Sequence, residues 1–160
     1  MATASHNLST YDPTSVPSGA GRRFALVVSE WNLEITDALR TGAKETLMKH
    51  GVAPEDILET WVPGSFELAL GAQILLETET LDGVICLGSV VRGETPHFDF
   101  VCQGTAQGIM SVGLKFGRPV IFGVLTDNTM EQARDRSGGK HGNKGVDCAV
   151  AVLKMAALKG

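Results

Sequence analysis

The sequence has no apolar run that approaches the ~18 residues of a membrane-spanning helix, and residues 1–20 lack the apolar stretch of a secretory signal. It has only three cysteines, and their spacing is not that of metal ligands, so we expect no metal site and reduced, buried thiols. A net charge of −4 without a dense Lys/Arg stripe argues against nucleic acid as the main partner. These absences predict a cytoplasmic protein that is not embedded in a membrane.

Residues 1–20 are rich in Ser, Thr and Pro, and we expect them to form a flexible arm in front of a single domain over residues 21–160. Within that domain, short apolar runs alternate with segments of helical periodicity. The expected strands are 24–28, 57–62, 84–91 and 119–125, and the expected helices are 35–47, 66–76, 98–115 and 146–158. This alternation predicts an α/β fold, a three-layer α/β/α sandwich with a four-stranded parallel sheet of the flavodoxin-like, doubly wound type.

Two glycine motifs of nucleotide-binding proteins are missing or incomplete. The dinucleotide fingerprint is absent after the first expected strand, where the chain has Ser29-Glu30-Trp31-Asn32. The glycine-rich segment 138–145 lacks the Ser or Thr that a P-loop requires after Gly139-Lys140, and no strand is expected before it. We therefore expect a flexible turn there.

In a doubly wound sheet, ligands bind beyond the carboxyl ends of the strands. The loops expected at that edge are Ser29–Asn32, Pro63–Glu67, Ser89–His97 and Thr126–Thr129. The segment 88–100 is the most informative, because a buried-type strand runs through a Gly/Ser/Thr turn into a helix that begins near His97. Free amides and the dipole at such a helix start favour an anion, and they favour a neutral imidazole able to accept a proton.

Each candidate site residue also has a plain structural interpretation. His97 could be a surface histidine, and Trp31 could be a core residue. Glu67 could do no more than complement the dipole of a helix for which Ser65 is a candidate cap. Phe122 fits the core of a strand unless a second subunit uses it, and the cations Arg136 and Lys144 could be solvated. The functional alternatives are an indole that stacks on a heteroaromatic ring, a carboxylate that binds hydroxyl groups and a guanidinium that binds phosphate.

Five ordered motifs together resemble the lumazine synthase family, over about residues 23–158. They are Trp31-Asn32, Pro63 to Leu68, Gly88 to Phe98, Phe122 to Thr126, and Gln132 through Arg136 to Gly145. The resemblance implies a transferase that performs the penultimate step of riboflavin biosynthesis without a metal or organic cofactor. That step condenses 5-amino-6-(D-ribitylamino)uracil with 3,4-dihydroxy-2-butanone 4-phosphate to 6,7-dimethyl-8-ribityllumazine, with release of phosphate and water.

The same resemblance assigns roles to individual residues. His97 would shuttle protons and Arg136 would grip the phosphate. The residues implied in substrate binding are Trp31, Asn32, Gly64, Ser65, Phe66, Glu67, Ser89, Val90, Val91, Glu94, Thr95, Phe122 and Lys144. Phe122, Arg136 and Lys144 would reach the site from a neighbouring subunit.

The resemblance further implies a homopentamer, with sites at the subunit interfaces. The segment 138–144 lacks the insertion that often marks members restricted to pentamers, so it favours an icosahedral shell of twelve pentamers. Riboflavin synthase is a candidate partner of such a shell. Two alternatives stay open: a non-catalytic flavin-binding or storage protein, which needs no proton shuttle, and an electron carrier of the flavodoxin type, which needs a hydroxyl-rich phosphate loop after the first strand.

Overall fold

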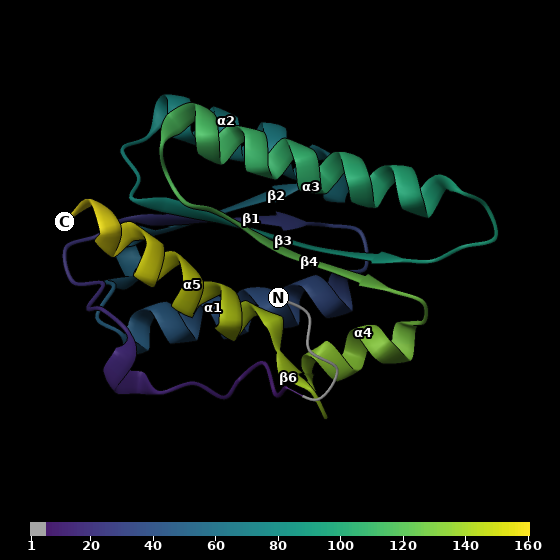
Figure 1. The fold of residues 1–160 in the computed structure, drawn as a ribbon, viewed down its shortest axis with the longest axis horizontal. Helices are drawn as coiled ribbons and strands as arrows, with labels where there is room; N and C mark the ends of the chain where they lie inside the picture. Colours follow the sequence, from purple (N-terminus) through teal and green to yellow (C-terminus); the bar gives the residue numbers. More distant parts are fainter. Residues whose placement is uncertain (1–5) are drawn as a thin grey trace.

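A parallel sheet of four strands forms the middle layer of the computed structural model, which describes residues 6–160 (Figure 1). The strand order is β2-β1-β3-β4, and all three pairings are parallel. The strands are β1 (Phe24–Ser29), β2 (Ile57–Val62), β3 (Gly83–Val91) and β4 (Val120–Asp127). Because all four run in the same direction, their carboxyl ends lie along one edge of the sheet.

Helices cover both faces of this sheet, so the predicted three-layer α/β/α sandwich is confirmed. In Figure 1, α2 (Leu68–Thr78) and α3 (His97–Phe116) lie above the sheet. Below it lie α1 (Leu33–Lys49), α4 (Met130–Arg136) and α5 (Lys144–Ala156). None of the helices in residues 6–160 combines the length and the apolar character that a membrane crossing requires.

Side chains of β1 alternate between two apolar cores, one on each side of the sheet. Leu26 and Val28 pack in the core with α1 and α5, whereas Ala25 and Val27 pack in the core with α2 and α3. Every residue of β1 is buried, because helices cover both of its faces. Of the three cysteines expected to be buried, Cys86 and Cys148 are buried, but Cys102 on α3 is only half-buried.

Two local expectations are wrong, and one short helix escapes the prediction. The segment predicted as a flexible turn contains an antiparallel hairpin of β5 (Ser137–Gly139) and β6 (Gly142–Asn143). The short helix α4 was not predicted, since it has only seven residues and one of them is buried. Ser65 does not cap α2. It lies in a short 3₁₀ turn, Ser65–Glu67, and its hydroxyl has no hydrogen-bond partner in the described part of the chain.

The described part of the predicted arm, residues 6–20, lies along the layer of α1 and α5 in its own chain. The Leu8 amide donates to the His141 carbonyl (2.8 Å), and the Tyr11 hydroxyl lies 3.0 Å from His50 Nε2. In Figure 1 this segment is the purple chain below the helices. Residues 1–5 of the predicted arm lie outside the described residues.

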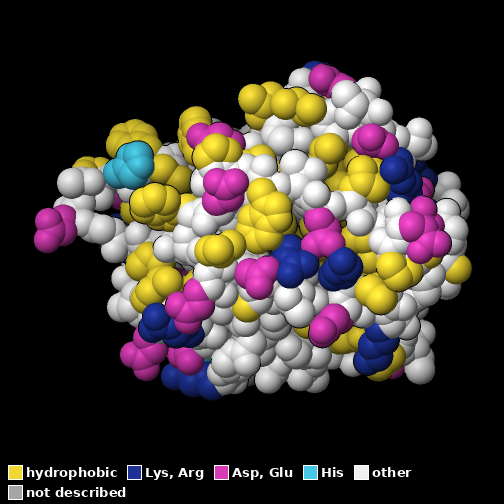
Figure 2. All heavy atoms as spheres, turned by 180° about the vertical axis from the view of Figure 1, so that it is seen from behind, with side chains coloured by type: hydrophobic (Ala, Val, Ile, Leu, Met, Phe, Trp, Pro, Cys, Tyr) yellow, Lys and Arg dark blue, Asp and Glu magenta, His cyan; other side chains and the backbone are white. Residues whose placement is uncertain are grey.

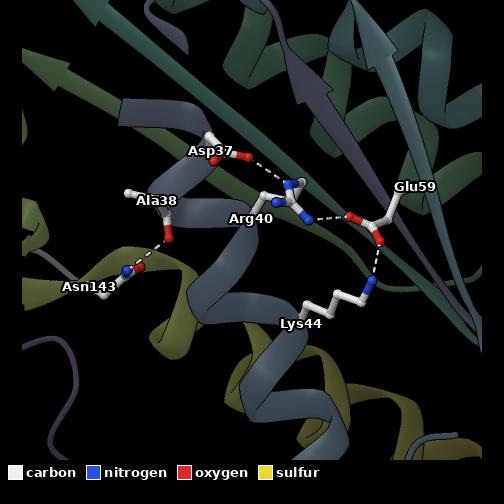
Figure 3. Close-up of polar contacts among 6 residues, drawn as sticks. All are labelled: Asp37, Ala38, Arg40, Lys44, Glu59 and Asn143. Carbon is white, nitrogen blue, oxygen red and sulfur yellow. Dashed lines mark hydrogen bonds and ion pairs between the residues drawn. The ribbon is translucent and has the colours of Figure 1, made fainter. Parts of the chain in front are cut away.

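A small ion-pair network fixes α1 against the edge strand β2 (Figure 3). Arg40 donates to Glu59 (2.6 Å) and to Asp37 (2.8 Å), and Lys44 donates to the other oxygen of Glu59. Burial opposes the charge of Glu59, but the two cations outweigh this effect and lower the pKa of the carboxyl. Glu59 therefore stabilises the fold in its ionised form.

We expect Glu59→Gln to destabilise the protein by about 1 kcal/mol at pH 7, because ion pairs that remain partly open to solvent contribute little more. This corresponds to a fall of about 2–4 °C in unfolding temperature, measured by circular dichroism. The stabilisation is present above the glutamate pKa of the unfolded chain and is lost as the pH falls through the lower pKa of the folded state. The gap between wild type and variant should therefore shrink in acid. Glu55→Gln, at a carboxylate with no ion pair among the described residues, is the control; equal effects of the two variants would contradict the assignment.

Candidate functional site

A cavity of about 620 Å³ lies beyond the carboxyl ends of β1, β2 and β3, beside the start of α3. This is the edge of the sheet where the topology predicts ligand binding. The lining residues are Trp31, Asn32, Gly64, Ser65, Phe66, Glu67, Ser89, Val90, Val91, Gly93, Thr95, His97, Phe98, Phe100 and Val101. The cavity thus brings together the ends of three separate βα units.

The first side of the cavity follows β1. Trp31 is 72% exposed, so its indole is a surface of the cavity and not a core residue. Asn32 has φ 59° and ψ 50°, a left-handed conformation that asparagine tolerates better than most residues. Its side-chain amide donates to the Ser89 carbonyl (3.0 Å), and the Trp31 amide donates to the Pro63 carbonyl (3.2 Å). These bonds connect the loop after β1 to the ends of β3 and β2.

The second side follows β2, where the 3₁₀ turn carries Phe66 and Glu67. A Cβ at Gly104 on α3 would lie only 2.9 Å from the Phe66 ring, so this ring rests on a helix surface that a larger residue would block. A Cβ at Gly64 would lie 3.1 Å from Glu67 Oε2. Glycine at position 64 therefore leaves room for the carboxylate beside the backbone of the turn.

Two serine hydroxyls in the wall of the cavity have no partner among the described residues. They belong to Ser65 and Ser89, both of which are buried. The Ser65 carbonyl is held by the Thr105 hydroxyl of α3 (3.2 Å), so this turn is fixed while its own hydroxyl stays unpaired. A buried hydroxyl without a partner costs free energy, and both oxygen atoms are covered by the surrounding protein.

The third side is the loop from β3 to α3. Arg92 fixes the beginning of this loop: its guanidinium lies 4.3 Å from the Phe98 ring centre and donates to Asp99 (3.2 Å) and Asn128 (3.1 Å). The exposed residues Glu94 and Thr95 follow, and Thr95 lines the cavity whereas Glu94 does not. His97 is the first residue of α3, exposed and facing the cavity.

Eleven of the fifteen predicted site residues line the cavity of their own chain: Trp31, Asn32, Gly64, Ser65, Phe66, Glu67, Ser89, Val90, Val91, Thr95 and His97. The prediction missed four further lining residues: Gly93, Phe98, Phe100 and Val101. Phe98 and Phe100 stand in the motif 97–100, and their alternation with polar residues at a helix start is a signal that could have indicated the cavity wall. Phe100 is 72% exposed, whereas Phe98 is buried against Arg92.

Phe122, Arg136 and Lys144 do not line the cavity of their own chain. Phe122 is 36% exposed on the edge strand β4, and Arg136 ends α4. Lys144 begins α5 and donates to Asp147 (2.6 Å). Burial opposes the charge of Lys144, but the hydrogen bond to Asp147 raises its pKa above the ordinary value, so the amine stays cationic.

Comparison with known proteins identifies the family. A family model described as 6,7-dimethyl-8-ribityllumazine synthase matches residues 21–160. The chain is 56% identical over 155 residues to the 6,7-dimethyl-8-ribityllumazine synthase of Parabacteroides distasonis, with 97% of each chain covered. The enzymes of the same name from Porphyromonas gingivalis (54% over 159 residues, 99% of each chain) and Cytophaga hutchinsonii (54% over 157 residues, 98% of each chain) are similar at the same level. The chain therefore belongs to the 6,7-dimethyl-8-ribityllumazine synthase family.

Proposed function

We propose that this chain is a transferase of riboflavin biosynthesis that condenses 5-amino-6-(D-ribitylamino)uracil with 3,4-dihydroxy-2-butanone 4-phosphate to form 6,7-dimethyl-8-ribityllumazine. Phosphate and water are released. The observation that carries the proposal is the single cavity that collects Trp31, Glu67 and His97 in a chain of this family. These groups suit a flat ring, a polyhydroxylated chain and a proton transfer, respectively.

The pyrimidine substrate fits the apolar side of the cavity. In our proposal its ring stacks on Trp31, its ring edge meets the backbone of residues 89–91, and its ribityl hydroxyls bind Glu67. Phe66 closes the site over Gly104, and Asn32 and Gly64 shape the backbone around it.

The chemistry needs no nucleophile from the protein. The amine of the pyrimidine attacks the ketone of the second substrate, and loss of water gives a Schiff base. Phosphate elimination and ring closure then require proton transfers, which we assign to His97. The turn at Glu94 and Thr95, beside the start of α3, receives the phosphate, and Arg136 stabilises its charge. No metal or organic cofactor takes part in this scheme.

Arg136, Phe122 and Lys144 reach the cavity from a neighbouring subunit in our proposal, which requires a homo-oligomer. One support is that all three lie outside the cavity of their own chain. A second support is the exposed apolar surface of α2 and α3: Leu70, Ile74, Phe100, Met110 and Leu114 are each between 49% and 76% exposed. Figure 2 shows exposed apolar side chains in several groups across one face, including its upper part, where this helix layer lies. Exposed apolar side chains along neighbouring helices are typical of subunit interfaces.

We further propose that the chain forms pentamers and that twelve pentamers assemble into an icosahedral shell. The shell would lie in the cytoplasm, and riboflavin synthase is its candidate partner. The uninterrupted hairpin of β5 and β6 supports the shell, and three unpaired cysteines fit a reducing compartment. Light scattering of the purified protein distinguishes a shell from a free pentamer. A monodisperse monomer at micromolar concentration would contradict both the assembly and the shared site.

The direct test of the activity mixes both proposed substrates with the purified protein and follows the absorbance of the lumazine product. The condensation also proceeds slowly unaided, so the rate without protein is subtracted. We expect product formation that scales with protein concentration. A rate equal to the background with folded, assembled protein would refute the proposed activity.

A further inference from the structure

Asp127 is a buried carboxylate that the proposed reaction leaves without a role. It is the last residue of β4, and its register partner is Val91 of β3, which lines the cavity. Asp127 is only 6% exposed, and its Oδ2 has no hydrogen-bond partner within residues 6–160. Its own carbonyl accepts from the Arg92 amide (2.9 Å), so the backbone at this position is fixed. Burying a carboxylate with an unpaired oxygen costs free energy of folding unless a nearby cation compensates its charge.

The nearest cation is the guanidinium of Arg136. Its Nη1 lies 3.9 Å from Asp127 Oδ1 and donates to the Gln132 carbonyl (3.1 Å). The described residues offer no hydrogen-bond partner to Arg136 Nε or Nη2. The side chain is 35% exposed. One side of the guanidinium is therefore held by its own chain, and the edge formed by Nε and Nη2 remains open to a ligand.

The turn between β4 and α4 fixes the distance between these two groups. Thr129 caps α4 by accepting from the Gln132 amide (3.2 Å), and the Gln132 side chain accepts from the Asn128 amide (2.8 Å). This double contact holds Gln132, whose carbonyl in turn holds Arg136. The carboxylate at the start of the turn and the guanidinium at the end of α4 thus belong to one rigid unit.

We propose that Asp127 is a positioning residue for Arg136: it holds the Nη1 side of the guanidinium so that the Nε–Nη2 edge points outward and binds the phosphate of the second substrate. Arginine suits this role because its planar fork can bind two partners on different edges. Burial raises the pKa of Asp127, whereas the positive charge of Arg136 acts to lower it. The ionised form of this carboxylate is therefore stabilised by Arg136. The inference rests on the proposed role of Arg136 in phosphate binding.

The test compares Asp127→Asn with wild type in steady-state kinetics of the assembled protein. Asparagine keeps the shape and removes the charge. We expect KM for the phosphorylated substrate to rise about tenfold, kcat to stay within about twofold, and KM for the pyrimidine to stay unchanged, because only the phosphate contact depends on the orientation of Arg136. Asp37→Asn is the matched control: it also removes a carboxylate beside an arginine, Arg40, but on α1 and outside the cavity lining. It should leave all three constants unchanged.

A double-mutant cycle separates positioning from a general loss of structure. If Asp127 acts through Arg136, Asp127→Asn should change KM less than twofold in an Arg136→Gln background. Calorimetry with inorganic phosphate provides a readout without turnover, and there the single Asp127→Asn change should weaken binding about tenfold. An equal effect of Asp127→Asn in both backgrounds, or an equal rise of both KM values, would overturn the inference. Failure of the wild type to form product would refute the proposed reaction instead, and the phosphate titration would still decide the role of Asp127.

Discussion

His97→Ala is expected to lower the rate of lumazine formation roughly a hundredfold in single-turnover assays without abolishing it. His97 is the imidazole in the cavity lining, at the first position of α3, and positioned acid–base groups typically contribute 10²–10⁴ in rate. Residual catalysis should persist because the cavity still holds both reactants together, and proximity does not depend on this side chain.

The side chain of His97 is exposed, so its removal should leave the unfolding temperature unchanged. His6→Ala is the matched control, since His6 is an exposed histidine in the arm and outside the cavity lining. We expect the control to have the wild-type rate. A loss of twofold or less for His97→Ala would remove this imidazole from the mechanism and leave the proton transfers to water or to substrate groups.

The sheet could be predicted because each of its inner strands is apolar on both faces. β1 and β3 contain the continuous apolar runs Phe24–Val28 and Val84–Leu87, and the structure gives each strand the predicted length to within one residue. β4 extends to Asp127, two residues beyond the prediction, because the polar pair Thr126 and Asp127 continues the pairing with β3 through backbone bonds that need no apolar side chain. Hydropathy does not reveal such an extension.

The region after β4 could not be predicted on the same grounds. α4 is a single short helix held by a Thr129 cap and by only two apolar residues, Met130 and Ala133, which pack against the core. The following hairpin depends on Gly138 (φ 120°) and Gly142 (φ 81°), whose left-handed backbone allows the tight reversal. A glycine-rich segment indicates that the chain turns, but it does not indicate which residues pair across the turn.

The site was predicted from two different sources. The loops after β1, β2 and β3 follow from the topology of a parallel sheet, and they do meet in one cavity. The pairing of that cavity with Phe122, Arg136 and Lys144 came from the family resemblance, because no pattern within one chain says that a residue serves a second copy. The same limit applies to Asp127, whose significance appears only when its unpaired oxygen and the nearby guanidinium are seen together.

Gly145→Ala is expected to have the largest effect on stability. Gly145 is the second residue of α5, where this helix crosses the backbone of α1. A Cβ there would overlap the Leu39 carbonyl oxygen and lie 3.0 Å from the Ala43 amide nitrogen. These are main-chain atoms of a helix, so no side-chain rotation can make room. The two helices would have to move apart.

Asn143 makes such a movement costly, because it joins the same two helices. Its side-chain amide donates to the Ala38 carbonyl of α1 (3.0 Å, Figure 3), and its side-chain oxygen accepts from the Gly145 amide (2.8 Å). Separation of α1 and α5 would stretch these bonds and open the core that both helices share with the sheet. We therefore expect a loss of about 3 kcal/mol, which is the upper end of the usual cost of overpacking.

This loss corresponds to a fall of roughly 6–12 °C in unfolding temperature for a chain of this length. Gly93→Ala is the matched control, because a Cβ at Gly93 meets no atom within 4 Å and its backbone lies outside the left-handed region. The control should unfold within about 2 °C of wild type, since alanine restricts the unfolded chain slightly and adds no clash. If Gly145→Ala proved as stable as the control, α5 could shift along α1 freely, and the rigid placement of Lys144 at its first residue would lose its structural basis.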